Sequence, residues 1–252
     1  MNRPYKWLAR YYDQIFAPFR GPIDAARERV LGKILPAIGS ACDLACGTGT
    51  TAVEMARGGI RMFAVDASPA MCRLAREKAR SAGVPLRVLR ADMRTFRLPE
   101  PVDLVICECD ALNHVPLKAD LRRVAKAVAR ALRPGGYFFF DVNNRSGFEA
   151  YWCTCFWTER PGVVLVMRNG NDARHGQAWS DIEWFIKEGS LWRRHHERVD
   201  EVCWTAGEIQ HALRQAGFGG LHTWDGAQFF KNDPLMRAGC RTVYLARKEA
   251  RR

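Results

Sequence analysis

The glycine-rich stretch Asp43–Thr50, with the sequence DLACGTGT, has the residue types of a tight turn between a strand and a helix. Gly47 and Gly49 allow the backbone to approach a ligand closely, because glycine has no Cβ atom. Asp66 ends the next apolar run, where a carboxylate can accept hydrogen bonds from two ribose hydroxyls. The spacing therefore predicts a site for a nucleoside-containing cofactor.

Two common nucleotide-binding motifs do not fit this turn. A dinucleotide fingerprint has a third glycine where this chain has Ala52, next to the bulkier Val53. A phosphate-binding P-loop continues with Gly-Lys-Ser or Gly-Lys-Thr, and neither sequence follows Gly49. The residues thus favour a different class of nucleoside cofactor.

Asp43–Gly49 resembles the first motif of class I S-adenosylmethionine-dependent methyltransferases, and four further segments resemble later motifs of this family in the same order. They are the loop with Asp66, Ser68 and Met71, the third strand ending at Asp92, the fourth strand and rim at Val102–Val115, and the passage Leu132–Asn144 into the fifth strand. Together they cover about residues 40 to 145.

The resemblance implies S-adenosylmethionine as the cofactor and S-adenosylhomocysteine as its product. The glycine turn would contact the methionine part of the cofactor and Asp66 the ribose. Asp92 would accept from the adenine amino group, and the Met93 backbone would meet the ring edge. The expected cofactor-binding residues are Asp43, Ala45, Cys46, Gly47, Gly49, Asp66, Ala67, Met71, Asp92, Met93 and Glu108.

The segment Asp110–His114 is similar to the family's active-site rim, so the methyl acceptor is expected beside it. His114 is the candidate general base, because histidine ordinarily titrates near neutral pH. The alternative is that it only stacks beside the cofactor or caps a helix. Near the N-terminus, Tyr12–Phe16 resembles a family segment that folds over the cofactor, although it could simply be a packing helix. The predicted catalytic residues are His114, Asp110, Asn113 and Tyr12.

A metal site is not expected. The pairs Cys107/Cys109 and Cys153/Cys155 lack the CxxC spacing with a second matching pair that zinc sites use. Nine scattered cysteines indicate reduced, mostly buried thiols in a cytoplasmic enzyme.

Apolar strands that alternate with helices predict the α/β class, with a doubly wound, Rossmann-like parallel sheet. The carboxyl ends of such strands meet at one edge, which would bring the motifs together. The resemblance adds a seven-stranded order of 3-2-1-4-5-7-6 with strand 7 antiparallel. Strands are expected near 41–45, 61–66, 86–91, 102–108, 137–142, 219–225 and 241–247, and helices near 23–35, 50–58, 69–82, 118–132 and 205–215.

The chain divides into three predicted parts. Residues 1–36 would form N-terminal helices or a lid, and residues 37–146 with 201–252 would form the cofactor-binding domain. Residues 147–200 are rich in aromatic side chains and alternate in polarity, which predicts an inserted antiparallel sheet over the acceptor site. Packing is the ordinary role of such aromatic residues, while a cation-binding pocket is the alternative.

The net charge of +12 favours acidic partners, but the basic residues are dispersed along the chain. No apolar run is long enough to span a membrane. We therefore expect a cytoplasmic monomer or homodimer, of EC 2.1.1 type, that methylates a nitrogen or oxygen of a small molecule. One alternative is an RNA methyltransferase acting on a ring nitrogen or ribose, which is less favoured. The other is a non-catalytic, S-adenosylmethionine-binding regulatory protein.

Overall fold

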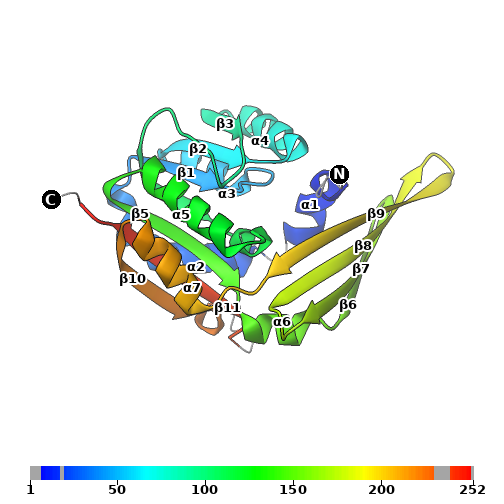
Figure 1. The fold of residues 1–252 in the computed structure, drawn as a ribbon. Coiled ribbons are helices and arrows are strands. Elements are labelled where there is room, and N and C mark those ends of the chain that lie inside the picture. The colour runs from blue at the N-terminus through cyan, green and yellow to red at the C-terminus, as the bar shows by residue number, and fades with distance from the viewer. Residues whose placement is uncertain (1–6, 18–19, 230–238, 251–252) are drawn as a thin grey trace.

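The computed structural model describes residues 7–17, 20–229 and 239–250, and its strands form two separate sheets (Figure 1). The larger sheet has seven strands in the order β3-β2-β1-β4-β5-β11-β10. They are β1 (Ser40–Leu44), β2 (Arg61–Asp66), β3 (Leu86–Arg90), β4 (Val102–Cys107), β5 (Leu132–Asn143), β10 (Phe218–Asp225) and β11 (Arg241–Lys248). Strand β11 is antiparallel to both of its neighbours, and the other pairs are parallel. The predicted fold class and strand order are confirmed.

Helices cover both faces of this sheet, because its strands are apolar on both sides. Val105 faces the core beneath α5 (Lys118–Ala131) and α7 (Ala206–Gln215), whereas the adjacent Ile106 faces the core beneath α2 (Gly21–Leu31), α3 (Thr50–Arg57) and α4 (Pro69–Ala82). Figure 1 shows these two helical layers. Ser68 caps α4, and the capping box of Thr205 and Glu208 starts α7 at the expected position.

Two predicted boundaries were wrong. The helix expected over 23–35 spans Gly21–Leu31, because Pro22 suits a first helical turn, and Leu35–Ala37 forms a separate 3₁₀ turn. Strand β5 begins at Leu132 instead of 137. Leu132 already pairs with Val102, and the ladder continues at Tyr137 after a register shift.

The inserted sheet has four antiparallel strands in sequence order and follows α6 (Arg145–Tyr151). Its strands are β6 (Cys155–Arg160), β7 (Val163–Asp172), β8 (Gln177–Glu188) and β9 (Leu191–Val202). This confirms the predicted antiparallel insertion. The sheet lies beside the larger sheet, and helix α1 (Leu8–Phe16) lies between them (Figure 1).

Helix α1 is fixed to the inserted sheet at its start. The buried Glu197 carboxylate accepts hydrogen bonds from the backbone N–H groups of Trp7 at 2.9 Å and Leu8 at 3.2 Å, and from the Trp184 indole at 3.0 Å. The first N–H groups of a helix have no partner inside the helix, so this carboxylate satisfies them. Apolar residues of α1 such as Ile15 pack on the same face of the sheet.

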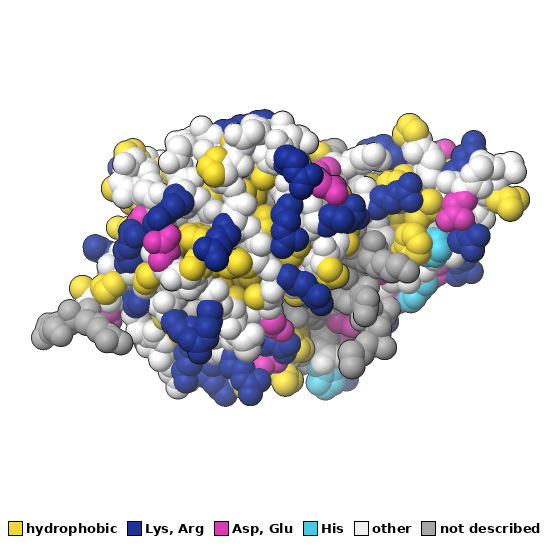
Figure 2. Space-filling model, turned by 90° about the horizontal axis from the view of Figure 1, so that it is seen from above, with side chains coloured by type: hydrophobic (Ala, Val, Ile, Leu, Met, Phe, Trp, Pro, Cys, Tyr) yellow, Lys and Arg dark blue, Asp and Glu magenta, His cyan; other side chains and the backbone are white. Residues whose placement is uncertain are grey.

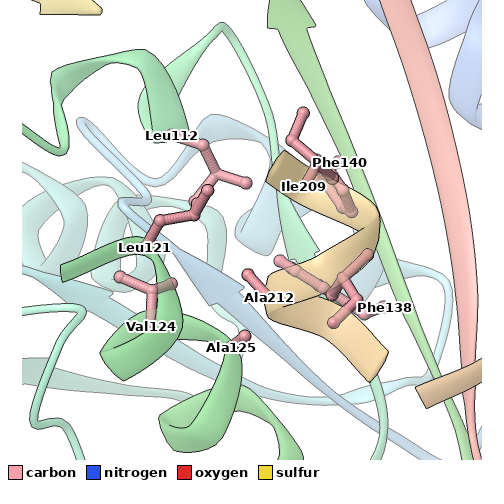
Figure 3. A pocket seen from close by; sticks show the side chains of 9 residues that line it. Leu112, Leu121, Val124, Ala125, Phe138, Phe140, Ile209 and Ala212 are labelled. Carbon is pink, nitrogen blue, oxygen red and sulfur yellow. The ribbon is translucent and has the colours of Figure 1, made fainter. Parts of the chain in front are cut away.

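The described residues also enclose a small void between α5, α7 and β5 (Figure 3). Its lining is wholly apolar and includes Leu121, Phe138 and Ile209. It is part of the hydrophobic core, since it offers a ligand no hydrogen-bonding side chain. No helix within the described residues is long and apolar enough to cross a membrane.

Candidate active site at the carboxyl edge of the sheet

The glycine turn connects β1 to α3 with two left-handed glycines that differ in their surroundings. A Cβ atom built on Gly47, which has φ +53°, would meet no atom within 4 Å. A Cβ atom on Gly49, which has φ +76°, would lie 2.7 Å from the Cβ of Ala75 in α4. Gly47 thus borders open space where a ligand could approach, while Gly49 is required for the close packing of α3 against α4. The packing role of Gly49 was not predicted.

Asp66 is held at the end of β2 by two backbone donors. The N–H of Gly47 donates to its Oδ2 at 2.9 Å, and the N–H of Ser68 donates to its Oδ1 at 2.7 Å. Burial raises the pKa of Asp66, and these hydrogen bonds oppose the increase. Each carboxylate oxygen has two acceptor sites, so both can still accept from a ribose hydroxyl.

Asp92 follows β3 at the same edge and is engaged by Arg94. The Arg94 Nε donates to Asp92 Oδ1 at 2.9 Å, and the Arg94 backbone N–H donates to the same oxygen at 2.8 Å. These bonds lower the pKa of Asp92. The carboxylate is therefore fixed and charged, and its predicted contact with an adenine amino group stays a prediction.

Asp43 and Glu108 lie buried beneath the turn with Arg27 of α2. Arg27 Nη1 lies 2.7 Å from both Glu108 oxygens, and the Thr51 hydroxyl donates to Glu108 at 3.1 Å. Burial raises the pKa of Asp43 to about 8; the nearby Glu108 adds to the increase and Arg27 opposes it. Burial thus favours the protonated form of Asp43. Arg27, which pairs with Glu108, could not be identified from the sequence, because nothing distinguishes it from the other basic residues of its helix.

The rim after β4 has an unusual backbone, held by Asp141. Cys109 and Asp110 both have positive φ angles, +57° and +52°, which are uncommon outside glycine. The Asp141 carboxylate accepts from their N–H groups at 2.8 and 3.0 Å. Arg241 of β11 pairs with Asp141 and, through Nη2 at 2.7 Å, with Asp110. Sequence reasoning identified neither Asp141 nor Arg241 as part of the site.

Three side chains meet at this rim: Asp110, His114 and Glu201. One ligand-type atom from each lies within 4.8 Å of the other two. Glu201 comes from β9 of the inserted sheet and is 6% exposed. Asn143 donates to its Oε2 at 3.3 Å. Burial and the nearby Asp110 raise the pKa of Glu201 well above its ordinary range. Sequence reasoning missed Glu201 because a charged strand residue is ordinarily solvent-exposed.

The other two predicted rim residues have different surroundings. Asn113 is fully buried, and its amide donates to the carbonyl oxygens of Asn143 at 3.0 Å and Val202 at 2.8 Å. It therefore joins the rim to both sheets. Tyr12 on α1 is half-buried, and its pKa is raised by burial and by the nearby Cys109 and Asp110. Tyr12 therefore lies near the rim, and its predicted role at the acceptor stays a prediction.

Helix α1 also contacts the glycine turn directly. The Asp13 carboxylate accepts from the Thr48 hydroxyl at 2.6 Å and pairs with Lys78 of α4 at 2.6 Å. The helix that presents Tyr12 to the rim is thereby linked to both the inserted sheet and the cofactor turn.

A seven-stranded sheet of this order, with a glycine turn after β1 and acidic residues after β2 and β3, defines the class I methyltransferase architecture. The family model described as a methyltransferase domain matches residues 41–136. Together with the sheet order, this match supports the class I S-adenosylmethionine-dependent methyltransferase family, whose cofactor is S-adenosylmethionine.

Known proteins resemble the chain over most of its length. YqeM from Bacillus subtilis, which has a provisional methyltransferase name, is 26% identical over 216 residues, covering 85% of this chain and 86% of YqeM. An S-adenosylmethionine-dependent methyltransferase from Clostridium acetobutylicum has a TM-score of 0.81 at 23% identity, covering 98% of this chain and 99% of its own. The sugar N-methyltransferase KedS8 from Streptoalloteichus has a TM-score of 0.77 at 21% identity. The match covers 99% of this chain and 94% of KedS8.

Proposed function

We propose that this protein transfers the methyl group of S-adenosylmethionine to a nitrogen or oxygen of a small molecule. One observation carries the proposal: Asp110, His114 and Glu201 meet at the rim after β4, the sheet edge that also holds Gly47 and Asp66. The fold of a sugar N-methyltransferase, KedS8, supports a small-molecule acceptor.

The residues at the carboxyl edge of the sheet are proposed to hold and orient S-adenosylmethionine. Open space beside Gly47 leaves room for it, Asp66 would accept from the ribose hydroxyls, and Asp92 would face the adenine amino group. When bound, S-adenosylmethionine supplies an electrophilic methyl group on a sulfonium sulfur. Asp43 and Glu108, with Arg27, would support the turn from beneath.

The remaining residues are proposed to act on the acceptor. An in-line displacement needs the nucleophile on the far side of the methyl carbon and a group that accepts its proton. His114 would take that proton. Tyr12 would exclude water from the rim, because α1 is attached at Glu197 on one side and at Thr48 on the other. Residues 147–200 would then cover the acceptor, residues 1–36 would act as the lid, and the remainder would bind the cofactor.

The basic surface gives less support to RNA as the acceptor. Figure 2 shows lysine and arginine side chains spread over much of the visible face, among hydrophobic and other side chains. A track for a nucleic-acid backbone would need them aligned along a groove. Cytoplasmic location and a monomeric or homodimeric state stay predictions.

The test is transfer of labelled methyl from S-adenosylmethionine into an extract of host cells, followed by size separation. Label in the small-molecule fraction is expected. Label in nuclease-sensitive polymer would contradict the proposal in favour of RNA methylation. Tight cofactor binding without label in any fraction would favour a non-catalytic regulatory protein.

A further inference from the structure

The side chains of Asp110, His114 and Glu201 have the spacing of a site for one small cationic group. Three atoms within 4.8 Å of one another all lie within about 2.8 Å of a common point, which is the usual length of an N⁺–H···O hydrogen bond. The rim loop supplies Asp110 and His114, and the inserted sheet supplies Glu201. A ligand there would therefore bridge the two sheets.

The charges around this point favour a cation. The carboxyl groups of Asp110, Asp141 and Glu201 lie around a single buried guanidinium, that of Arg241. Burial beside Asp110 makes a charge on Glu201 unfavourable, and a bound cation would relieve that cost. Arg241 is 8% exposed, and its Nε has no hydrogen-bond partner among the described residues. A ligand oxygen next to the cationic group would satisfy this buried donor.

An ammonium group suits these surroundings better than a divalent metal ion. Arg241 lies 2.7 Å from Asp110, so one of the three ligands is already paired with a positive charge. Magnesium and calcium ions take six or more oxygen ligands, whereas these three side chains offer one ligand atom each. A primary ammonium group also has three N–H donors, one for each of the three acceptor atoms.

We propose that the methyl acceptor is an amine, bound as its ammonium form by Asp110, His114 and Glu201. This inference rests on the proposed methyltransferase function and narrows its acceptor class. Glu201 is then the residue that selects an amine over a hydroxyl group.

Residues of this chain can accept the proton and neutralise the charge in the transfer step. His114 takes one proton from the bound ammonium and leaves a neutral amine with a lone pair. That lone pair forms the N–CH₃ bond while the C–S bond breaks and its electrons stay on sulfur. The product is an N-methylammonium group, which Asp110 and Glu201 still neutralise. The proton on His114 returns to solvent, since this side chain is half-buried.

The experiment uses a host-cell metabolite extract divided on a cation-exchange resin into a retained, amine-rich fraction and an unretained, neutral or acidic fraction. Each fraction is incubated with the full chain and methyl-labelled S-adenosylmethionine. Glu201→Gln is compared with Glu159→Gln, the same change at an exposed position of the inserted sheet. Binding of S-adenosylhomocysteine, measured by calorimetry, reports whether each variant is folded.

We expect the original protein to transfer label only into the retained fraction. The amount of label should fall at least 10-fold in Glu201→Gln and stay unchanged in Glu159→Gln. Both variants should still bind S-adenosylhomocysteine. Label only from the unretained fraction would overturn the ammonium proposal and leave the methyltransferase function intact. Loss of activity with EDTA and its recovery with Mg²⁺ would overturn it in favour of a metal site. No label from either fraction would contradict the methyltransferase function itself.

Discussion

The carboxylate of Asp13 lies 2.6 Å from the hydroxyl of Thr48, so the N-terminal helix is bound to the middle of the glycine turn. Lys78 of α4 strengthens this contact by pairing with the same carboxylate at 2.6 Å. Because Glu197 holds the other end of α1, the helix connects the inserted sheet to the cofactor edge. Opening of α1 at this edge therefore requires the Asp13 contacts to break.

We predict that Asp13→Ala loosens α1 without unfolding the protein. Asp13 is partly exposed, so the loss of global stability should be about 1 kcal/mol or less. Hydrogen exchange of the α1 amides should become faster, while exchange in β1 and β4 should not change. The control is Gln14→Ala, the exposed neighbour on the same helix. Equal exchange in both variants would show that the Asp13 contact does not retain the helix.

We predict that Asp66→Ala weakens S-adenosylmethionine binding about 10-fold or more, because ribose donors would lose their acceptor. Isothermal calorimetry measures this directly. Glu77→Ala, at an exposed position of α4, serves as the control and should bind normally. Unchanged affinity in Asp66→Ala would refute the ribose assignment.

The two glycines of the turn should respond differently to alanine. Gly49→Ala brings a Cβ within 2.7 Å of Ala75 at a positive φ, so the free energy of unfolding should fall by roughly 1–3 kcal/mol. Gly47→Ala meets no atom within 4 Å, so its stability should fall only by the roughly 1–2 kcal/mol of a positive φ, and it should also lose cofactor affinity. Urea unfolding and calorimetry separate these effects.

Gly207→Ala is the matched control for Gly49→Ala. Gly207 lies in the first turn of α7, and an added Cβ there would meet nothing within 4 Å. Alanine is a better helix former than glycine, so this variant should be as stable as the original or slightly more so. A Gly49→Ala protein of equal stability would contradict the packing role of Gly49.

We predict that stability falls as the pH rises towards 8, partly because of Asp43. The folded-state pKa is raised to about 8, so the folded protein keeps a proton that the unfolded chain has lost above its ordinary carboxyl pKa. This contribution is complete below about pH 4 and is lost as the pH rises through 8. In Asp43→Asn, the urea midpoint should fall less between pH 5 and 8 than in the original protein. An identical pH dependence would contradict the raised pKa of Asp43.

We predict that His114→Ala lowers kcat about 100-fold or more, as expected when a general base is removed. The control is His175→Ala, at an exposed position between β7 and β8. Turnover at the original rate across the pH range would exclude His114 as the base.

The positions of the motif residues in the fold could be predicted because their signals are local. Asp66 is the last residue of β2, and the glycines and Asp92 lie in the loops after β1 and β3. Parallel strands end at one edge whatever the details of packing. The boundary errors at α2 and β5 have local causes too, namely Pro22 and the register shift after Val102. Neither error displaced a predicted site residue.

The sequence by itself determined the α/β class and the sheet edge at which the motif residues meet, because strand periodicity and turn signals depend on residues close together in the chain. The tertiary structure alone decided that Glu201 and Arg241 join Asp110, since Arg241 lies 131 positions from it along the chain. A charged residue in a strand does not reveal which face it occupies or what covers it. Only the packing of β9 and β11 against the rim buries these charges together. Burial lowers the effective dielectric constant, so their interaction with a charged ligand becomes stronger.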